Sequence, residues 1–575
     1  MRRSRMVALT GAVALATSAL GATTTATALT TAGTTTARTD YAVLAAEGTD
    51  ARALATRLEQ AGATVTSVNT AVGLVTVSST QSGFAARARS LPGVSGAAVN
   101  GVVGRATTTA PAAPDPVEKE HAFDKSRANG SGAVPAPPPG GDPLDGLLWG
   151  MDMIDAPEAH AVETGRKVRV GILDTGVDGT HPDLAPNFDN ALSRNFTTDI
   201  PAIDGPCEYA DCVDPANVDD DGHGTHVAGT IAAALNGVGL SGVAPDADIV
   251  NIRGGQDSGY FFLSPVVNAL TYAGDEGIDV VNMSFYVDPW LYNCQGGAPE
   301  DTPEQAAEQD LIITAMTRAL RYASEKGVTL VGALGNNHED MADPRTDTSS
   351  PDYPGGTEHP RTIDNATCFD LPVEGPDVVG VSALGPSERK ADYSNYTTDL
   401  ASGEIEVSAP GGWYRDGLGT SSYRTNGNLI LSTAPLNVLL ATGEVDKNGN
   451  VTKAGRTNGV LKSCSNGKFN ENTATCGYYQ WLQGTSMASP HAAGVAALVV
   501  AAHGSGTSAA DFGLPSAQTR SILMATARDH ACPDGGSQSY LDVGRTAEFT
   551  ATCVGTTSFN GFYGDGIVNA LRAVS

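Results

Sequence analysis

The sequence Gly484-Thr-Ser-Met-Ala-Ser-Pro-His491 stands directly before an apolar run, Ala492 to Val500, that predicts a buried helix. The glycine and its small neighbours allow a sharp backbone turn, so Ser486 would lie exposed at the start of this helix. The positive end of the helix dipole there favours negative charge that develops nearby. Such a serine is either an ordinary helix N-cap or a nucleophile, and a nucleophile needs a histidine and a carboxylate as partners.

Two further segments offer those partners. The β-branched run 168–173 predicts a strand that ends at Asp174, and His223 begins a predicted helix over 223–235, within Gly-His-Gly-Thr-His. The carboxyl ends of parallel strands are where chemistry usually lies. Asp174 is either a turn residue or the carboxylate that orients an imidazole. The His223 and His226 pair lacks the glutamate and third ligand of zinc hydrolases, so His226 is expected to be structural.

Strands and helices alternate from Leu147 onward. Predicted strands at 168–173, 247–252, 280–285 and 328–333 are separated by helices that begin at 223, 264 and 302. This alternation predicts an α/β fold with a mostly parallel central sheet, covered on both faces. Residues 337–481 are richer in Gly, Pro, Asn and Asp, with short strands at 378–381 and 406–408, and 410–475 is predicted to be an insertion of loops and hairpins.

The chain upstream of the α/β region divides into three parts. Residues 41–103 follow the order β-α-β-β-α-β, which predicts a small ferredoxin-like α+β sandwich. Residues 104–144 are rich in Pro, Ala and Gly and predict a linker. Residues 1–38, with three early arginines and an apolar stretch from Met6 to Leu20, predict a secretory signal peptide. That stretch is too short to span a membrane, and no later segment is expected to cross one.

Composition agrees with export. The net charge of −29 argues against nucleic acid and anionic membranes as partners. Eight cysteines, all after residue 200, fit a disulfide-bonded extracellular protein and form no zinc motif. In the alternative interpretation, some of these cysteines are free thiols. Proximity in the sequence predicts the pairs Cys207–Cys212, Cys464–Cys476 and Cys532–Cys553, which leaves Cys294 with Cys368.

Three segments together resemble the motifs of the subtilisin-like serine proteases, or subtilases (peptidase S8 family). They are Asp174-Thr-Gly, Gly-His223-Gly-Thr-His and Gly-Thr-Ser486-Met-Ala-Ser-Pro. The order Asp, His, Ser is the order known for subtilisin. The resemblance covers residues 147–575, the expected catalytic domain, and residues 41–103 resemble the subtilase propeptide. It implies the subtilisin-like three-layer fold with a mostly parallel central sheet, preceded by a ferredoxin-like propeptide.

The resemblance also implies a role for each matching residue. Asp174 would orient the imidazole, His223 would act as general base and then general acid, and Ser486 would attack the scissile carbonyl. The segment Gly332-Ala-Leu-Gly-Asn336 resembles the family's Ala-Ala-Gly-Asn, so the side-chain amide of Asn336 would donate to the oxyanion.

The expected substrate-binding residues are Ser284, Phe285, Tyr286, Ala333, Leu334 and Gly335. The first three lie in Asn282-Met-Ser-Phe-Tyr286, which resembles the family's Asn-Met-Ser-Leu-Gly, a segment that pairs with substrate as an added strand. Tyr286 replaces a glycine and Leu334 replaces an alanine, so the family's side-chain preference does not carry over. The acidic net charge predicts attraction of cationic substrates, and Phe285 and Tyr286 predict affinity for apolar or aromatic side chains.

We therefore expect a secreted, extracellular serine endopeptidase, made as a preproenzyme and inhibited by its own propeptide. It would act as a monomer on proteins or peptides, with no nucleic-acid or membrane partner, no cofactor in its chemistry and no predicted metal ligands. The segment 218–221, Val-Asp-Asp-Asp, is either a solvated acidic loop or part of a structural calcium site, which no motif supports. Alternatives are a processing protease of narrow specificity and an inactive binding protein on the same scaffold. A lipase would carry G-x-S-x-G, which this chain lacks around Ser486.

Overall fold

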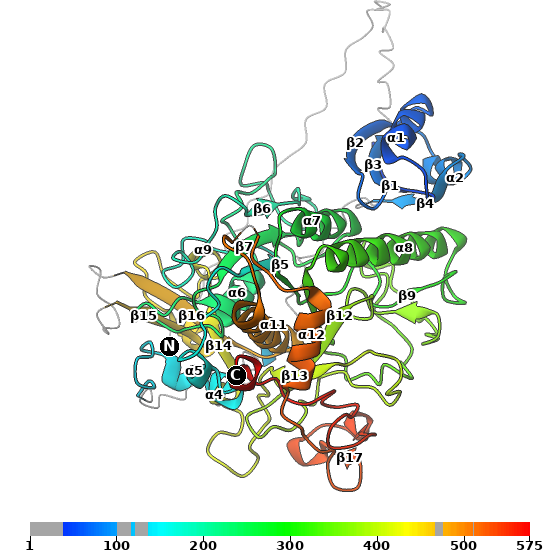
Figure 1. Ribbon diagram of the computed structural model, residues 1–575. Helices are drawn as coiled ribbons and strands as arrows, with labels where there is room; N and C mark the ends of the chain where they lie inside the picture. Colours follow the sequence, from blue (N-terminus) through cyan, green and yellow to red (C-terminus); the bar gives the residue numbers. More distant parts are fainter. Residues whose placement is uncertain (1–37, 101–116, 121–135, 466–474, 510) are drawn as a thin grey trace, which may run out of the picture. The chain divides into compact units, whose positions relative to one another are not determined.

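The computed structural model describes residues 38–100, 117–120, 136–465, 475–509 and 511–575. The predicted signal peptide up to residue 37 and most of the predicted linker therefore lie outside the described residues. Helices and strands are named as in Figure 1.

The N-terminal unit is a four-stranded antiparallel sheet with two helices (Figure 1). Its sheet order, β2-β3-β1-β4, confirms the ferredoxin-like prediction. The side chain of Asp50 accepts a hydrogen bond of 2.7 Å from the N–H of Ala53 and so caps the first helix. The second helix begins directly after Gly83, which adopts a left-handed conformation. The elements are β1 (Thr39–Ala45), α1 (Ala51–Gln60), β2 (Thr64–Asn69), β3 (Leu74–Ser79), α2 (Phe84–Arg89) and β4 (Val94–Val99).

The centre of the larger region is a seven-stranded sheet whose neighbouring strands are all parallel. Its strand order is β13-β12-β10-β8-β5-β7-β6. The strands are β5 (Arg169–Leu173), β6 (Arg194–Asn195), β7 (Asp248–Arg253), β8 (Val280–Met283), β10 (Thr329–Ala333), β12 (Val378–Leu384) and β13 (Val407–Pro410).

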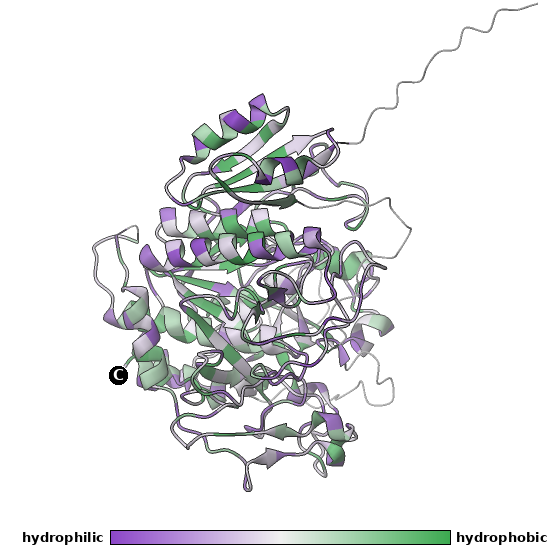
Figure 2. Cartoon of the chain, turned by 90° about the vertical axis from the view of Figure 1, so that its right-hand side faces the viewer, coloured by the Kyte–Doolittle hydropathy of each residue, from purple (hydrophilic) through white to green (hydrophobic). Residues whose placement is uncertain are grey.

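Helices cover both faces of this sheet. Successive strand residues point to opposite faces: Val280 packs in the hydrophobic cluster that contains α6 (His223–Ala232) and α11 (Thr485–His503). Val281 packs in the cluster that contains α7 (Leu263–Asp275) and α8 (Pro303–Glu325). Apolar residues concentrate in the strands between these layers (Figure 2). The three-layer, subtilisin-like prediction is confirmed.

The side chain of Thr302 forms a capping box with Gln305 at the start of α8, as the Thr-Pro-Glu sequence indicates. Helix α11 has the length and apolar composition of a membrane span, contrary to the expectation that no later segment would. It is instead a core helix, since 89% of its apolar window is buried inside the protein.

The N-terminal unit packs its sheet on α7 and α8. Arg318 of α8 donates to the carbonyl oxygens of Ala45 (2.9 Å) and Val72 (3.0 Å). Asn69 donates to Asn268 Oδ1 (2.9 Å) on α7. Leu44 of β1 lies in the same hydrophobic cluster as α7 and α8. The outer face of the two helices is thus covered by apolar and polar contacts together.

The predicted insertion 410–475 contains more regular structure than loops and hairpins. Its strands form a three-stranded antiparallel sheet in the order β14-β16-β15. Six of the seven residues of β16 are buried, so the strand lacks the alternating pattern that marks a half-exposed hairpin. The elements are β14 (Ile430–Thr433), α9 (Leu436–Ala441), α10 (Lys453–Thr457), β15 (Val460–Cys464) and β16 (Cys476–Leu482), which leads directly into α11.

The remaining short elements lie around this frame. They are α4 (Trp149–Met153), α5 (Ala156–Ala159), β9 (Asn293–Cys294), β11 (Cys368–Phe369), α12 (Ser516–Ala525), β17 (Ser537–Gln538), β18 (Ala551–Thr552) and α13 (Ala570–Ala573), with single 3₁₀ turns at 145–147, 426–428, 541–543 and 547–549. All four disulfides are those predicted: Cys207–Cys212, Cys294–Cys368, Cys464–Cys476 and Cys532–Cys553.

Candidate active site

The candidate site lies at the carboxyl end of the parallel sheet. Asp174 directly follows β5, His223 is the first residue of α6, and Ser486 is the second residue of α11. His223 and Ser486 line one cavity of about 620 Å³, together with Asn336, which follows β10. The three motifs, far apart in the sequence, therefore converge where the sheet and the two helix N-termini meet.

Asp174 and His223 form a direct hydrogen bond. Nδ1 of His223 lies 2.8 Å from Oδ1 of Asp174, and the N–H of Thr175 donates to the same oxygen at 2.8 Å. Asp174 is fully buried. The close approach depends on Gly224, because a methyl group in its place would lie 2.2 Å from the carbonyl oxygen of Gly176. The glycine after His223 is therefore a packing requirement of the Asp174 loop on α6.

The acidic segment before His223 caps this helix. Asp219 is fully buried and accepts hydrogen bonds from the N–H groups of Gly222 and Thr225, each 2.9 Å long. Asp221 accepts a 3.0 Å hydrogen bond from the N–H of His223. Carboxylates at a helix N-terminus satisfy N–H groups that have no intrahelical partner. The solvated-loop interpretation of residues 218–221 is therefore wrong for Asp219, which holds His223 in place.

Ser486 is held against the end of β8. Its hydroxyl lies 3.4 Å from the carbonyl oxygen of Ser284, and the hydroxyl of Ser284 donates to the carbonyl oxygen of Ser486 at 3.2 Å. Asn282 donates to the Ser284 hydroxyl (2.9 Å) and accepts from Ser489 (2.6 Å). This buried network fixes the first turn of α11 on the predicted substrate strand.

The amide of Asn336 is oriented by the start of α11. Its Oδ1 accepts hydrogen bonds from the N–H (2.9 Å) and hydroxyl (3.0 Å) of Thr485. A methyl group on Gly484 would lie 3.5 Å from Nδ2 of Asn336 and 3.4 Å from Oε1 of Glu118. The donor end of the amide and the Glu118 carboxylate therefore border the same small space beside Ser486.

Glu118 is the residue that the sequence did not indicate. It belongs to the described segment 117–120, within the predicted linker, and its Oε1 lies 3.3 Å from Nε2 of His223. The Ser486 hydroxyl also hydrogen-bonds to Glu118. The carboxylate therefore takes up the side of the imidazole that would face the serine. Glu118 belongs to a short charged run, Glu118-Lys119-Glu120, between the Ala- and Pro-rich parts of the linker, but no motif marks it as a site residue.

The charges of this pair depend on one another. Burial opposes charge on His223, but the carboxylates of Asp174 and Glu118 outweigh it and raise the histidine pKa well above its usual value. Burial also opposes charge on Glu118, but the attraction of His223 and hydrogen bonds from His223 and Ser486 lower its pKa. The structure is thus that of an imidazolium–carboxylate pair, in which His223 has no free base site.

Segment 117–120 is anchored on both sides of Glu118. The side-chain amide of Gln483 donates to the carbonyl oxygen of Val117 at 2.9 Å. The backbone N–H of Gln483 donates to the carbonyl oxygen of Glu118 at 3.2 Å. The carboxylate of Glu120 pairs with Arg415 and Arg545. These contacts hold Glu118 in the cavity independently of its bond to His223.

His226 is structural, as expected. Its Nε2 lies 3.0 Å from the carbonyl oxygen of Gln480, and burial lowers its pKa to about 3. The ring is therefore neutral and ties α6 to β16.

The expected substrate-binding residues divide into two groups. Ser284, Phe285, Tyr286, Ala333 and Gly335 line the cavity. Leu334 does not: it is fully buried and packs with Met341, Val373 and Ile405. Its expected place beside the specificity pocket is wrong, because Ala333 and Gly335 face the cavity and the residue between them faces the core.

Acidic groups elsewhere could hold a cation. Carboxylate oxygens of Asp199, Glu208 and Asp214 lie within 4.8 Å of one another, as do those of Asp214, Asp220 and Asp257. In the second group Arg253 already pairs with Asp214 and Asp257. None of these five carboxylates is among the residues that line the cavity of the candidate site.

A comparison with protein families decides the affiliation of the chain. The family model described as the subtilase family (peptidase S8) matches residues 165–566, the region that contains Asp174, His223, Asn336 and Ser486. The chain belongs to the subtilase family. It is therefore a serine-type endopeptidase, and the chemistry of this family needs no cofactor.

Curated relatives agree. This subtilase is 33% identical over 279 residues to an intracellular serine protease of Paenibacillus polymyxa, with 47% of this chain and 68% of the relative covered. It is 32% identical over 269 residues to the major intracellular serine protease of Bacillus subtilis, with 46% and 65% covered.

Solved structures share the fold. The epidermin leader peptide processing serine protease of Staphylococcus aureus superimposes with a TM-score of 0.58 at 18% identity, covering 94% of this chain and 98% of that one. Fervidolysin of Fervidobacterium pennivorans gives 0.51 at 22% identity, covering 94% and 61%. At this level of identity the likeness concerns the fold alone.

Proposed function

We propose that this subtilase hydrolyses peptide bonds with Asp174, His223 and Ser486 as its triad and Asn336 as oxyanion donor. The observation that carries the proposal is the 2.8 Å bond between His223 and buried Asp174, at a cavity that also holds Ser486 and Asn336. Asp174 holds the imidazole in one orientation and stabilises its cation. His223 takes the proton of Ser486 during attack and returns it to the leaving amine.

The negative charge that develops on the scissile carbonyl oxygen is met by two kinds of donor. The first N–H groups of α11, including that of Ser486, have no carbonyl partner within the helix. The amide of Asn336 is oriented by Thr485 so that Nδ2 borders the same space. Fixed donors of this kind stabilise the transition state more than the ground state, since the oxyanion exists only there.

We further propose that the chain is made as a secreted preproenzyme and that the structure is its latent form. Two contacts support this: the N-terminal unit lies on α7 and α8, and Glu118 lies against His223 and Ser486. The described contacts of the linker with the cavity begin at Val117, since residues 101–116 lie outside the described residues. Activity requires that segment 117–120 leaves the cavity.

A processing protease of narrow specificity is the second candidate. It is favoured by Tyr286, which stands where the family motif Asn-Met-Ser-Leu-Gly has glycine and whose hydroxyl donates to Asp352 at 2.7 Å at the cavity wall. A fixed ring at this point limits the side chains that the cavity accepts.

Replacement of the nucleophile tests the proposal. The full chain is secreted from a host, allowed to process, and treated with a fluorophosphonate that labels activated serines. We expect Ser486→Ala to abolish both labelling and casein hydrolysis while the protein remains folded, since only a hydroxyl is lost. Ser505→Ala, an exposed serine beyond the same helix, is the matched control and should keep both. Hydrolysis by Ser486→Ala at the wild-type rate would show that another residue is the nucleophile.

A further inference from the structure

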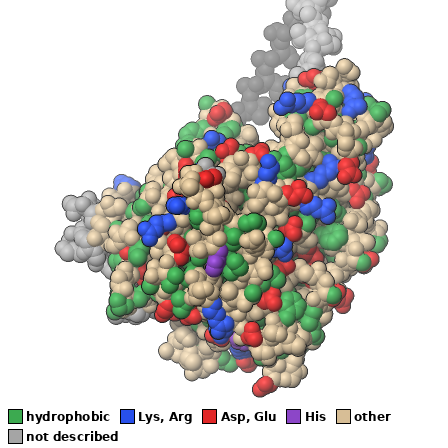
Figure 3. Space-filling view, viewed as in Figure 1, with side chains coloured by type: hydrophobic (Ala, Val, Ile, Leu, Met, Phe, Trp, Pro, Cys, Tyr) green, Lys and Arg blue, Asp and Glu red, His purple; other side chains and the backbone are tan. Residues whose placement is uncertain are grey.

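Besides Glu118, Asp221 and Glu444, three carboxylates line the cavity that holds Ser486 and Asn336. They are Asp288, Asp352 and Asp370, from three different loops. On the face shown in Figure 3, acidic and basic side chains are interspersed, so no field of a single sign covers that surface. The charged groups that line the cavity act on its contents at shorter range than charges on the surface do.

Asp370 has the most specific position of the three. It borders Gly335, the residue before Asn336: a methyl group on Gly335 would lie 3.6 Å from Oδ2 of Asp370. It follows β11, whose Cys368 is joined to Cys294 of β9 and pairs with it in the two-stranded sheet. The carboxylate is therefore held next to the wall that carries the oxyanion donor.

This carboxylate is buried without a cation. Asp370 is 4% exposed, and burial alone accounts for a pKa raised to about 8. Its backbone N–H donates to Glu374, but within the described chain no arginine, lysine or histidine pairs with its side chain. An ionised carboxylate in such a place is costly unless a positive group joins it. The cavity thus contains an acceptor that the protein itself does not satisfy.

The other two carboxylates reinforce this polarity. Asp288 lies beside Asp352, and burial and the charge of Asp352 raise the pKa of Asp288 well above its usual value. Asp352 also accepts the hydroxyl of Tyr286. The raised pKa favours the neutral form of Asp288, and the Tyr286 hydroxyl holds Asp352 at the cavity wall.

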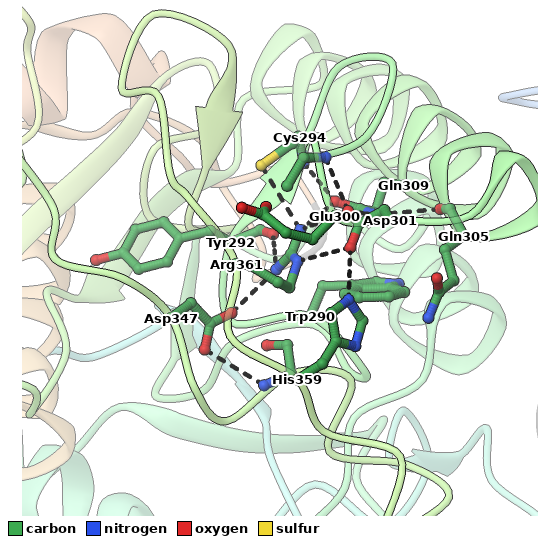
Figure 4. A network of polar contacts seen from close by, with 12 residues as sticks. Trp290, Tyr292, Cys294, Glu300, Asp301, Gln305, Gln309, Asp347, His359 and Arg361 are labelled. Atoms are coloured by element: carbon green, nitrogen blue, oxygen red, sulfur yellow. Dashed lines mark hydrogen bonds and ion pairs between the residues drawn. The ribbon is translucent and has the colours of Figure 1, made fainter.

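A buried network holds the loops that form this wall. Arg361 is fully buried and pairs with Asp301 (3.1 Å) and Asp347 (2.9 Å), and its guanidinium lies 4.6 Å from the centre of the Trp290 ring (Figure 4). The N–H of Leu291 donates to the hydroxyl of Ser350 (2.9 Å). The loops that carry Asp288 and Asp352 are thereby fixed to each other, which a site that binds a charged side chain requires.

We propose that this end of the cavity binds the side chain on the amino side of the scissile bond, that it selects arginine or lysine there, and that Asp370 is the residue that selects it. The proposal rests on the proposed function, since it takes Ser486 as the nucleophile and Asn336 as the oxyanion donor. A guanidinium or ammonium gives Asp370 its missing partner. An apolar side chain leaves the carboxylate buried and unpaired, and an acidic side chain is repelled.

The test compares substrates that differ only at the residue before the cut. The full chain is expressed, secreted and allowed to process, and the product is assayed on peptidyl-coumarin substrates. The residue before the cut in these substrates is arginine, lysine, citrulline, leucine or glutamate. Citrulline keeps the shape of arginine without its charge. We expect kcat/KM for arginine to exceed that for citrulline and leucine by about 10²-fold or more. Equal rates for arginine and citrulline, or faster cleavage after leucine, would overturn the cationic pocket.

Asp370→Asn assigns the preference to one residue. We expect the variant to lose most of the arginine-to-citrulline ratio. Asp364→Asn is the matched control, because it makes the same change at an exposed position six residues earlier and should keep the ratio. An unchanged ratio in Asp370→Asn would refute the assignment to Asp370. If the variant does not fold, competition of benzamidine against benzamide in the wild type decides, since only the cation should inhibit.

Fluorophosphonate labelling separates this inference from the proposed function. A wild type that is labelled at Ser486 and cleaves without preference for basic residues leaves the triad intact and refutes the cationic pocket. A folded and processed wild type that is not labelled refutes the proposed function itself.

Discussion

At the scale of the residue, Asn336 shows how the site prepares a donor before substrate arrives. Both hydrogen bonds to its Oδ1 come from Thr485, the residue directly before the candidate nucleophile. Any shift of the first turn of α11 therefore moves the donor and Ser486 together. The amide and the hydroxyl are one geometric unit, although they are far apart in the sequence.

Loss of this amide should slow the chemical step. We expect Asn336→Ala to lower kcat by about 10²–10³-fold with little change in KM, because the bond strengthens in the transition state. Steady-state kinetics on one peptide substrate measures both constants, and Asn190→Ala, an exposed asparagine, serves as the control. A change confined to KM would place Asn336 in ground-state binding instead.

Individual residues also mark the limit of what the sequence predicts. Asp174, His223 and Ser486 stand in short motifs whose neighbours, such as Gly224, are required by local packing, so the motif reports the site. Asp370 and Glu118 stand in no motif. Each acquires its role from contacts with residues far away in the sequence: Glu118 lies 105 positions from His223. Leu334 was misplaced because a motif does not tell which way each side chain faces.

At the scale of the element, the order of strands and helices was predictable and the insertion was not. Strands such as β8 and β10 are short apolar runs between helix signals, and their parallel pairing follows from that alternation. The sheet of β14, β15 and β16 lies between Pro- and Gly-rich loops, and burial on both faces removes the period of two from β16. Pattern reasoning has no signal to use there.

The disulfides differ in what they stabilise. Cys294–Cys368 closes a separation of 74 residues and joins β9 to β11, whereas Cys207–Cys212 closes only 5. In the chain-entropy model, loss of the longer loop costs about 4 kcal/mol of unfolding free energy and loss of the shorter loop about 2 kcal/mol.

We expect Cys294→Ser/Cys368→Ser to lower Tm more than Cys207→Ser/Cys212→Ser. Both pairs are made in a Ser486→Ala background, so that self-digestion does not obscure thermal unfolding. Equal Tm values for the two variants would show that loop closure does not determine their stability.

At the scale of the whole molecule, latency depends on the pair Glu118–His223, and its pH dependence follows from the two pKa shifts. His223 has a raised pKa, so its share of the stabilisation is complete below the ordinary histidine pKa and is lost as pH rises through the raised value. Glu118 has a lowered pKa, so its share is present above the ordinary glutamate pKa and is lost as pH falls through the lowered value. The latent form is therefore most stable around neutral pH and loosens in alkali.

Removal of the Glu118 charge should loosen the latent form at a lower pH. We expect fluorophosphonate labelling of Ser486 in the unprocessed full chain to accelerate as pH rises, and in Glu118→Gln to accelerate at lower pH, because His223 then loses one of its two carboxylates. Glu47→Gln, an exposed glutamate of the N-terminal unit, should behave as wild type. Identical pH profiles for Glu118→Gln and wild type would exclude Glu118 as the group that keeps the chain latent.

The position of Glu118 between two stretches of linker has a consequence for the response to dilution. A cut within residues 101–116 releases the N-terminal unit but leaves Glu118 covalently joined to the catalytic region, so its local concentration at His223 does not depend on how much protein is present. A cut within residues 121–135 severs that connection, and the inhibiting piece then dissociates as the sample is diluted. The two cleavage products differ by fewer than 40 residues, yet their inhibition responds differently to dilution. In the first, release of Glu118 is intramolecular and independent of protein concentration. In the second, the inhibiting piece and the catalytic region form a reversible complex with a dissociation constant.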